Sequence, residues 1–301
     1  MPDAKEFCAI IPTYRPDIDF PFRLELVATQ VGCVIVVDDS ECPATTLRLQ
    51  AVAALHRNLF VLHNEHNCGL AASLNKGIRE AKELGYRWLL TLDDDTLVRQ
   101  DMCRQLADSW TTISQSLPLG VLAMSWRSSP RDTRSSCVWR NKRMVITSGS
   151  LMSMETFDSI GPFRDEFIID AVDSDYCLRV RAHGLQVIEV ATQGFTQRLG
   201  HPRTVEWGPL RFTLQEHSPM RTYYRVRNST ALVMENWRRE PLYVAGAIYC
   251  NLQQVLATLL FYKEKRAHFL ATVDGFTHAW KGLFGFHELN VEKNECSDTN
   301  E

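Results

Sequence analysis

The first hundred residues alternate short, continuous apolar runs with a stretch whose apolar residues recur at helical spacing. The runs are expected to form strands near residues 7–11, 31–37, 59–62 and 86–92. Between the last two, Gly69 to Leu84 carries apolar residues three or four positions apart, which predicts a helix. Continuous apolar strands that alternate with helices are typical of a mostly parallel sheet covered by helices on both faces.

Polar residues follow three of these predicted strands directly. Thr13 comes after the first, Asp39 after the second, and Asp93 to Asp95 after the fourth. In open α/β sheets, ligands bind at the carboxyl ends of the strands. We therefore expect these polar side chains to converge on one crevice.

The triplet Asp93-Asp94-Asp95 is the most informative local feature. Alternate residues of an extended segment point the same way, so Asp93 and Asp95 can share one side. Their oxygens suit Mg²⁺ or Mn²⁺, which can in turn hold a diphosphate. A solvated acidic turn is the structural alternative. The position directly after a buried strand, and a second acidic pair at Asp38-Asp39, favour the ligand site.

Composition excludes several classes of protein. The 301 residues include 33 basic and 36 acidic side chains, a net charge of −3, which argues against a basic nucleic-acid binder. The nine cysteines contain no CxxC pair, so neither a zinc ribbon nor a redox motif is expected. Single cysteines in apolar runs fit a reducing cytosol. The polar N-terminus shows no secretory signal, and we expect a cytoplasmic protein.

The second half of the chain is less regular. Ser125 to Arg143 is rich in serine and arginine and is expected to be an exposed loop. Strands are expected near 151–154 and 187–190, and a helix over Asp173 to Ala182. From Arg221 onward the chain is expected to be helical.

The longest apolar stretch, Leu242 to Tyr262, leaves two interpretations open. Polar residues at its centre argue against a membrane-spanning helix, which needs about 20 mostly apolar residues. The helix either packs on the domain or lies in a membrane interface, for which cations stand on both sides. Those flanking residues are Trp237-Arg238-Arg239 before the stretch and Lys263, Lys265 and Arg266 after it.

Seven short motifs stand in the order that they have in one enzyme family. They are Ile10–Tyr14, Val36–Ser40, Asn67–Ile78, Asp93–Asp95, Asp170–Arg179, Gly200–His201 and His217–Asn228. In these motifs the chain resembles the inverting glycosyltransferases of family 2, and most of all their bacterial rhamnosyltransferase branch. Each motif is weak alone, but seven in order are specific.

The resemblance implies the GT-A fold, with a Rossmann-like, mostly parallel central sheet and helices on both faces. The catalytic domain is expected over residues 1–228 and a C-terminal helical region, able to associate with a membrane, over 229–290. Residues 291–301 form a polar tail that is expected to be disordered.

The resemblance also implies a nucleotide site. The residues carried over to it are Thr13, Tyr14, Asp38, Asp39, Asn67, Gly69, Asn75 and Asp93. Among them Thr13 and Asp39 would line the pocket for the base and ribose, with Asp38 supporting them. Arg221 and Arg227 resemble residues that contact the diphosphate or the acceptor, although a basic helix end explains them equally well.

Two further roles follow from the resemblance. Asp95 and His201 would bind Mn²⁺ or Mg²⁺, which stabilises the leaving diphosphate. Asp173 matches the aspartate that serves as the catalytic base, although Val172 stands where many relatives have glutamate.

The implied reaction is transfer of a sugar, with inversion, from a nucleotide sugar to an acceptor hydroxyl. The favoured donor is dTDP-L-rhamnose, and the favoured acceptor is a bacterial surface glycan such as O-antigen or lipopolysaccharide core, made at the inner face of the membrane. A UDP-sugar, such as UDP-galactofuranose, is an alternative donor. A non-catalytic nucleotide-sugar-binding protein is the alternative from another class. A dinucleotide oxidoreductase is disfavoured because no G-x-G-x-x-G follows the first strand.

Overall fold

The computed structural model describes residues 2–127, 138–197, 202–207, 210–215, 217–262 and 264–287. The chain divides into two compact units. The first unit comprises Met1–Asp165 and Val172–Arg198, and the second comprises Glu166–Ala171 and Leu199–Glu301. The tail at 291–301, for which disorder is expected, lies outside the described residues.

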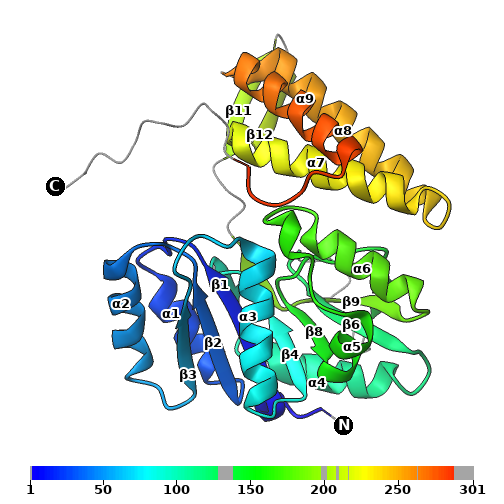
Figure 1. The fold of residues 1–301 in the computed structure, drawn as a ribbon. Helices are drawn as coiled ribbons and strands as arrows, with labels where there is room; N and C mark the ends of the chain where they lie inside the picture. The colour runs from blue at the N-terminus through cyan, green and yellow to red at the C-terminus, as the bar shows by residue number, and fades with distance from the viewer. Residues whose placement is uncertain are drawn as a thin grey trace. The chain divides into compact units, whose positions relative to one another are not determined.

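Within the described part of the first unit, eight strands form one sheet in the order β3-β2-β1-β4-β8-β6-β9-β7 (Figure 1). β3, β2, β1 and β4 are mutually parallel, β6 is parallel to β9, and β8 runs antiparallel to β4 and β6. The strands are β1 (Phe7–Thr13), β2 (Cys33–Asp38), β3 (Leu59–His63), β4 (Trp88–Thr91), β6 (Leu119–Ser125), β7 (Trp139–Asn141), β8 (Ser150–Ser153) and β9 (Gln186–Gln193).

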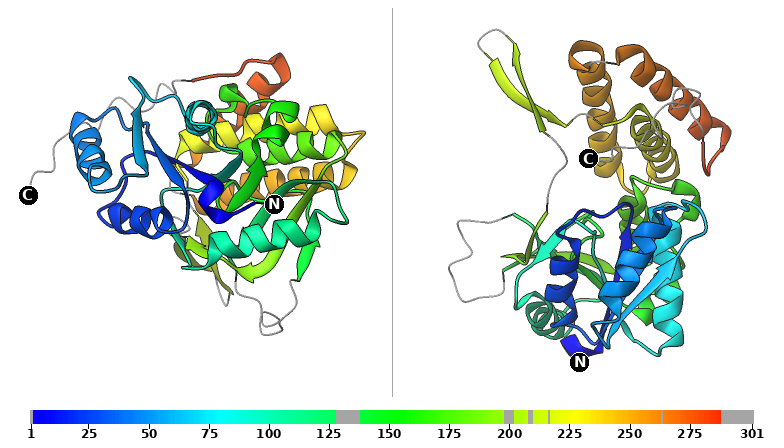
Figure 2. Two further views of the ribbon diagram at one scale, coloured as in Figure 1. Left: turned by 90° about the horizontal axis from the view of Figure 1, so that it is seen from below. Right: turned by 90° about the vertical axis from the view of Figure 1, so that its left-hand side faces the viewer.

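Helices cover both faces of this sheet (Figure 2). α1 and α4 pack on one face in a core shared with Phe7, Ala9 and Ile11 of β1. α3 packs on the other face, where Gly77 lies against Ile10. The helices of the unit are α1 (Phe20–Ala28), α2 (Pro43–Ala53), α3 (Leu70–Glu83), α4 (Met102–Ile113), α5 (Met154–Ile160) and α6 (Val172–Ala182). A two-stranded ribbon of β5 (Thr96–Val98) and β10 (Phe195–Gln197) completes it.

The predicted strands and helices of the first unit are confirmed, with two corrections. β1 continues through Pro12, although proline has no backbone N–H to donate. The strand tolerates it because β4 pairs only with Phe7–Ile10, so no backbone donor is needed at residue 12. The expected exposed loop over 125–143 is wrong for Trp139–Asn141, which is β7 and runs antiparallel to β9. All three β7 residues are exposed, so the strand has no apolar run to reveal it. Residues 128–137 of that loop lie outside the described residues.

The second unit combines a hairpin with helices. β11 (Pro202–Trp207) pairs antiparallel with β12 (Leu210–Gln215), and the helices are α7 (Pro219–Asn236), α8 (Pro241–Phe261) and α9 (Lys265–Lys281). The expected domain boundary at residue 228 falls inside α7, which is one continuous helix. α7 buries Tyr223 and Tyr224 in a core with Ala271 of α9.

Two glycines of these helices predict opposite effects on stability. A Cβ atom on Gly275 of α9 would lie 2.7 Å from the carbonyl oxygen of Tyr223 and 3.1 Å from the amide nitrogen of Arg227, whereas a Cβ on Gly246 of α8 would meet nothing within 4 Å. We expect Gly275→Ala to lower the free energy of unfolding by about 1–3 kcal/mol through overpacking. Gly246→Ala should raise it by about 0.5–1 kcal/mol, because alanine favours the helix. Denaturant unfolding of both variants checks this, and equal effects would contradict the close approach.

Candidate active site

The acidic triplet follows β4 and its carboxylates point in two directions. Asp94 accepts a hydrogen bond from the hydroxyl of Thr13 at 2.8 Å and one from the amide of Tyr14 at 3.4 Å. Asp93 accepts a hydrogen bond from the side-chain amide of Gln197 at 2.6 Å, and the same amide acts to lower the pKa of Asp95. Asp93 and Asp95 therefore share one side, as the alternation predicts, and Asp94 faces the end of β1.

Burial makes this cluster electrostatically unfavourable. Desolvation, followed by the charge of Asp95, raises the pKa of Asp93 to about 7. The pKa of the Asp95 carboxyl is also raised, chiefly by burial. One oxygen of Asp95, Oδ1, is buried without a hydrogen-bond partner among the described residues. Such a group lacks the donor or cation that normally compensates a buried carboxylate.

These features fit a divalent cation. The orphaned Oδ1 of Asp95 and the neighbouring carboxylate of Asp93 are hard oxygen donors of the kind that Mg²⁺ and Mn²⁺ bind. In the described part of the chain, no group of three or more His, Cys, Asp or Glu side chains is arranged to hold a metal ion. His201, the other ligand expected from the sequence, lies outside the described residues.

Asp39 organises the loop that leads into α3. Its Oδ1 accepts hydrogen bonds from the side chain of Asn64 at 2.7 Å and from the amide of Cys68 at 2.8 Å, and its Oδ2 accepts one from the amide of Gly69 at 2.8 Å. Burial nevertheless raises the pKa of the Asp39 carboxyl. Gly69 has φ +86°, which favours glycine at the start of α3. Asn67 supports the same turn, since its Oδ1 accepts from the Gly69 amide at 3.0 Å.

Asp38 and Asn75 are committed to the scaffold. Asp38 is completely buried and accepts hydrogen bonds from the amide of Ser40 at 3.1 Å and the hydroxyl of Thr46 at 2.7 Å. Asn75 pairs with both backbone groups of Phe163, at 2.8 and 2.9 Å, and donates to Asp165 at 2.5 Å. The side chain of Asn75 is buried and both of its polar groups already have partners.

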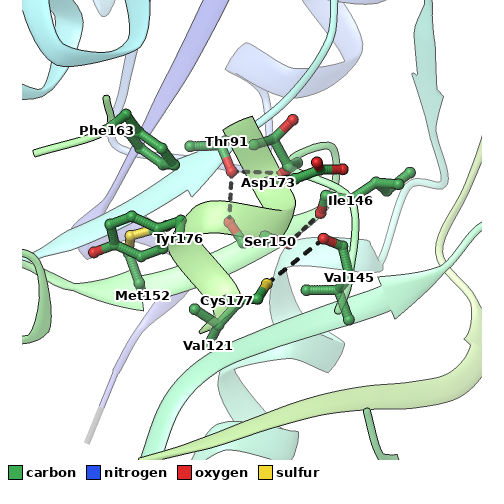
Figure 3. A pocket seen from close by; sticks show the side chains of 11 residues that line it. Thr91, Val121, Val145, Ile146, Ser150, Met152, Phe163, Asp173, Tyr176 and Cys177 are labelled. Atoms are coloured by element: carbon green, nitrogen blue, oxygen red, sulfur yellow. Dashed lines mark hydrogen bonds between the residues drawn. The ribbon is translucent and has the colours of Figure 1, made fainter. Parts of the chain in front are cut away.

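Asp173 lies in the first turn of α6 and lines a pocket (Figure 3). Its Oδ1 accepts a hydrogen bond from the amide of Ser174 at 2.7 Å. The wall of the pocket includes Thr91, the last residue of β4, and Cys177 of α6. The charge of Asp173 contributes to the raised pKa of Asp93, so the two carboxylates are electrostatically coupled. The first unit thus brings the triplet and Asp173 together.

The two arginines expected at the site have different environments. Arg221 is half-exposed and forms an ion pair with Asp170, with Nε 3.2 Å from Oδ2. Arg227 is 0% exposed and donates hydrogen bonds to the carbonyl oxygens of Gly285 at 2.6 Å and Glu166 at 2.8 Å. Because the guanidinium of Arg227 has no accessible surface, its position argues against the expected direct contact with the diphosphate or the acceptor.

The sequence interpretation misses three residues that shape the triplet. Asp94 stands inside it, and the alternation that pairs Asp93 with Asp95 could have assigned Asp94 to the opposite side. Ser148 supports the turn as an acceptor, since its Oγ accepts a hydrogen bond from the Asp93 amide at 3.1 Å. Neither Ser148 nor Gln197 carries a signal in one sequence, because both reach the triplet from far along the chain.

The Rossmann-like sheet has the GT-A fold, which solved glycosyltransferase structures share. The model of the family "Glycosyl transferase family 2" matches residues 8–160, more than half of the chain, and the chain belongs to this family.

A curated relative and two solved structures are similar over most of their length. The chain is 24% identical over 304 residues to a dTDP-rhamnosyl transferase, RfbF, of Shigella flexneri, covering 94% of this chain and 98% of that protein. The S. aureus TarS 1–349 structure in complex with UDP-GlcNAc matches with a TM-score of 0.60 and 16% identity, over 91% of this chain and 81% of that one. The mannosyltransferase PcManGT from Pyrobaculum calidifontis, in complex with GDP-Man and Mn²⁺, matches with a TM-score of 0.58 and 15% identity, over 93% and 89%.

Proposed function

We propose that this glycosyltransferase moves L-rhamnose from dTDP-L-rhamnose, with inversion, to a hydroxyl of a bacterial surface glycan such as O-antigen or lipopolysaccharide core. The observation that carries the proposal is that Asp173 lines a pocket together with Thr91, the last residue of β4, which the Asp93–Asp95 cluster follows. The similarity to a dTDP-rhamnosyl transferase over nearly the full length of both chains supports the choice of donor. A UDP-sugar remains the alternative donor.

The nucleotide would bind at the ends of β1 and β2. Thr13 ends β1 and Asp39 directly follows β2, and Asp39 fixes the turn of Asn67 and Gly69 through its hydrogen bonds. Tyr14 is 47% exposed and offers a ring on which a base can stack. The guanidinium of Arg221 is half-exposed, and we assign it the role of binding an anionic group of the donor or the acceptor.

Asp93 and Asp95, together with His201, would hold a divalent cation. When bound, the cation neutralises negative charge that develops on the leaving diphosphate. Asp173 accepts the proton of the attacking hydroxyl at a carboxylate oxygen, while the Ser174 amide donates to its Oδ1 and orients the carboxylate. The Asp39 carboxylate keeps the loop beside the nucleotide in place. A single base and no covalent intermediate suffice for inversion.

A donor screen tests this proposal. The purified protein is incubated with Mn²⁺ and a set of dTDP- and UDP-sugars, and the released nucleoside diphosphate is measured. We expect release from dTDP-L-rhamnose to exceed release from each UDP-sugar. Preference for a UDP-sugar would replace the donor, and binding without release from any donor would favour the non-catalytic alternative.

We also propose that α8 and α9 attach the protein peripherally to an anionic membrane. None of the helices among the described residues is long and apolar enough to cross a membrane. α8 contains no charged residue, and large apolar side chains are exposed along both helices. They include Leu242, Ile248, Tyr249, Leu252, Leu256, Leu260, Phe269, Val273, Phe276 and Trp280. The cations Arg238 and Arg239 before α8, and Lys265 and Arg266 in α9, complement anionic lipid headgroups.

Vesicle binding by variants of the exposed apolar residues checks this surface. We expect Leu252→Glu combined with Leu256→Glu to weaken binding to anionic vesicles at least about 10-fold. Each change removes apolar area that the membrane would bury and adds a negative charge that the anionic headgroups repel. Leu55→Glu, at an 81% exposed leucine of the first unit, serves as the matched control and should bind as the unchanged protein does. If the unchanged protein stays in solution beside anionic vesicles, the surface has no membrane role.

A further inference from the structure

The segment Glu166–Ala171 of the second unit has an unfavourable backbone conformation. Ile168, Asp170 and Ala171 have φ values of +62°, +62° and +60°. L-residues other than glycine rarely adopt this left-handed region, and a β-branched residue there is an outlier. Such conformations persist only where the surroundings hold them. Some group in the second unit must therefore hold this segment.

The side chain of Asn228 in α7 supplies that hold. Its Nδ2 donates to the carbonyl oxygens of Phe167 at 2.8 Å, Ile169 at 2.9 Å and Asp170 at 3.0 Å. Asn228 is completely buried, so these hydrogen bonds form away from water. One amide group thus contacts three carbonyls of the strained segment.

Arg227 fixes the orientation of that amide. Its Nε donates to Oδ1 of Asn228 at 2.9 Å, so the Asn228 Nδ2 is directed at the carbonyls. The other guanidinium nitrogens donate to the carbonyls of Glu166 and Gly285, and the Gly285 amide donates to Glu166 at 3.0 Å. Arg227 and Asn228 together bind the segment at both ends.

We propose that Arg227 and Asn228 are positioning residues for the transfer reaction. They hold Glu166–Ala171 in its left-handed conformation, and this segment is joined directly to α6, whose first turn carries Asp173. The inference rests on the proposed function, in which Asp173 is the base. A misplacement of about 1 Å in such a group costs up to about 100-fold in rate.

Kinetics and hydrogen exchange of Asn228→Ala test the proposal. We expect kcat to fall at least about 10-fold while donor affinity changes by less than about twofold, since only the base is displaced. Peptide-resolved amide exchange should quicken over residues 166–175. Thr222→Val is the matched control on α7: it removes a buried hydrogen bond to His268 and should leave kcat and exchange over 166–175 unchanged. Asn228→Ser, which reaches fewer carbonyls, replaces Asn228→Ala if that variant does not fold.

A glycine substitution separates positioning from a general structural role. Glycine adopts positive φ without a Cβ clash, so Ala171→Gly in the Asn228→Ala background should restore part of kcat. Unchanged exchange over 166–175 in Asn228→Ala, or equal losses of kcat in Thr222→Val, would overturn the proposal. The exchange measurement needs no donor or acceptor. The unchanged protein could transfer no sugar while Asn228→Ala still speeds amide exchange over residues 166–175. In that case the proposed function is wrong, but Arg227 and Asn228 still stabilise the segment.

Discussion

We expect Asp173→Asn to lower turnover by at least about 100-fold while donor affinity stays nearly unchanged. Asparagine keeps the shape of the side chain and loses the basic oxygen, so the proton of the acceptor hydroxyl has no acceptor in the transition state. The hydrogen bond from the Ser174 amide to Oδ1 can be kept by the asparagine carbonyl, which preserves the first turn of α6. Turnover measured beside calorimetric donor affinity checks the prediction.

Asp175→Asn is the matched control on the same helix. Asp175 is buried and pairs with Arg179 at 2.9 Å and Arg164 at 3.5 Å, which gives it a structural role. Its loss should lower the free energy of unfolding by about 1–3 kcal/mol and leave turnover within a few-fold. Retained turnover in Asp173→Asn, or a complete loss in Asp170→Asn instead, would show that the base is misassigned.

The second large effect is expected at the metal site. Asp95→Ala should abolish transfer and remove the Mn²⁺-dependent binding of the nucleoside diphosphate, because the variant loses the carboxylate whose Oδ1 lacks a partner. EDTA should abolish the activity of the unchanged protein, and added Mn²⁺ should restore it. Asp108→Ala, at an exposed aspartate of α4, serves as the control. Full activity in EDTA, or in Asp95→Ala, would contradict a metal ligand at this position.

The fold was predictable where burial leaves a periodic pattern. β1 to β4 and α3 appear in the sequence because their apolar residues are continuous or helically spaced. β7 does not, since this exposed edge strand has no continuous apolar run to mark it. α7 continues through residue 228, and the sequence does not mark this because the residues that the helix buries are dispersed along it.

The site was predictable where chemistry is local. The sharing of one side by Asp93 and Asp95 follows from strand alternation alone, and the hydrogen bonds of Gln197 agree with it. The burial of Asn75 and Arg227 depends on partners about 60 to 90 positions away, which one sequence does not reveal. A sequence motif indicates which residues lie near a site. Only the fold decides whether their polar atoms face a ligand or hydrogen bond the backbone.

The most direct test of the central claim is the release of nucleoside diphosphate from dTDP-L-rhamnose by the purified protein. With Mn²⁺ present, we expect the unchanged protein to release dTDP and Asp173→Asn to release it at least about 100-fold more slowly at equal donor occupancy. Equal rates in the two proteins, or no release from dTDP-L-rhamnose or any UDP-sugar, would contradict a transferase centre built on Asp173 and the Asp93–Asp95 cluster.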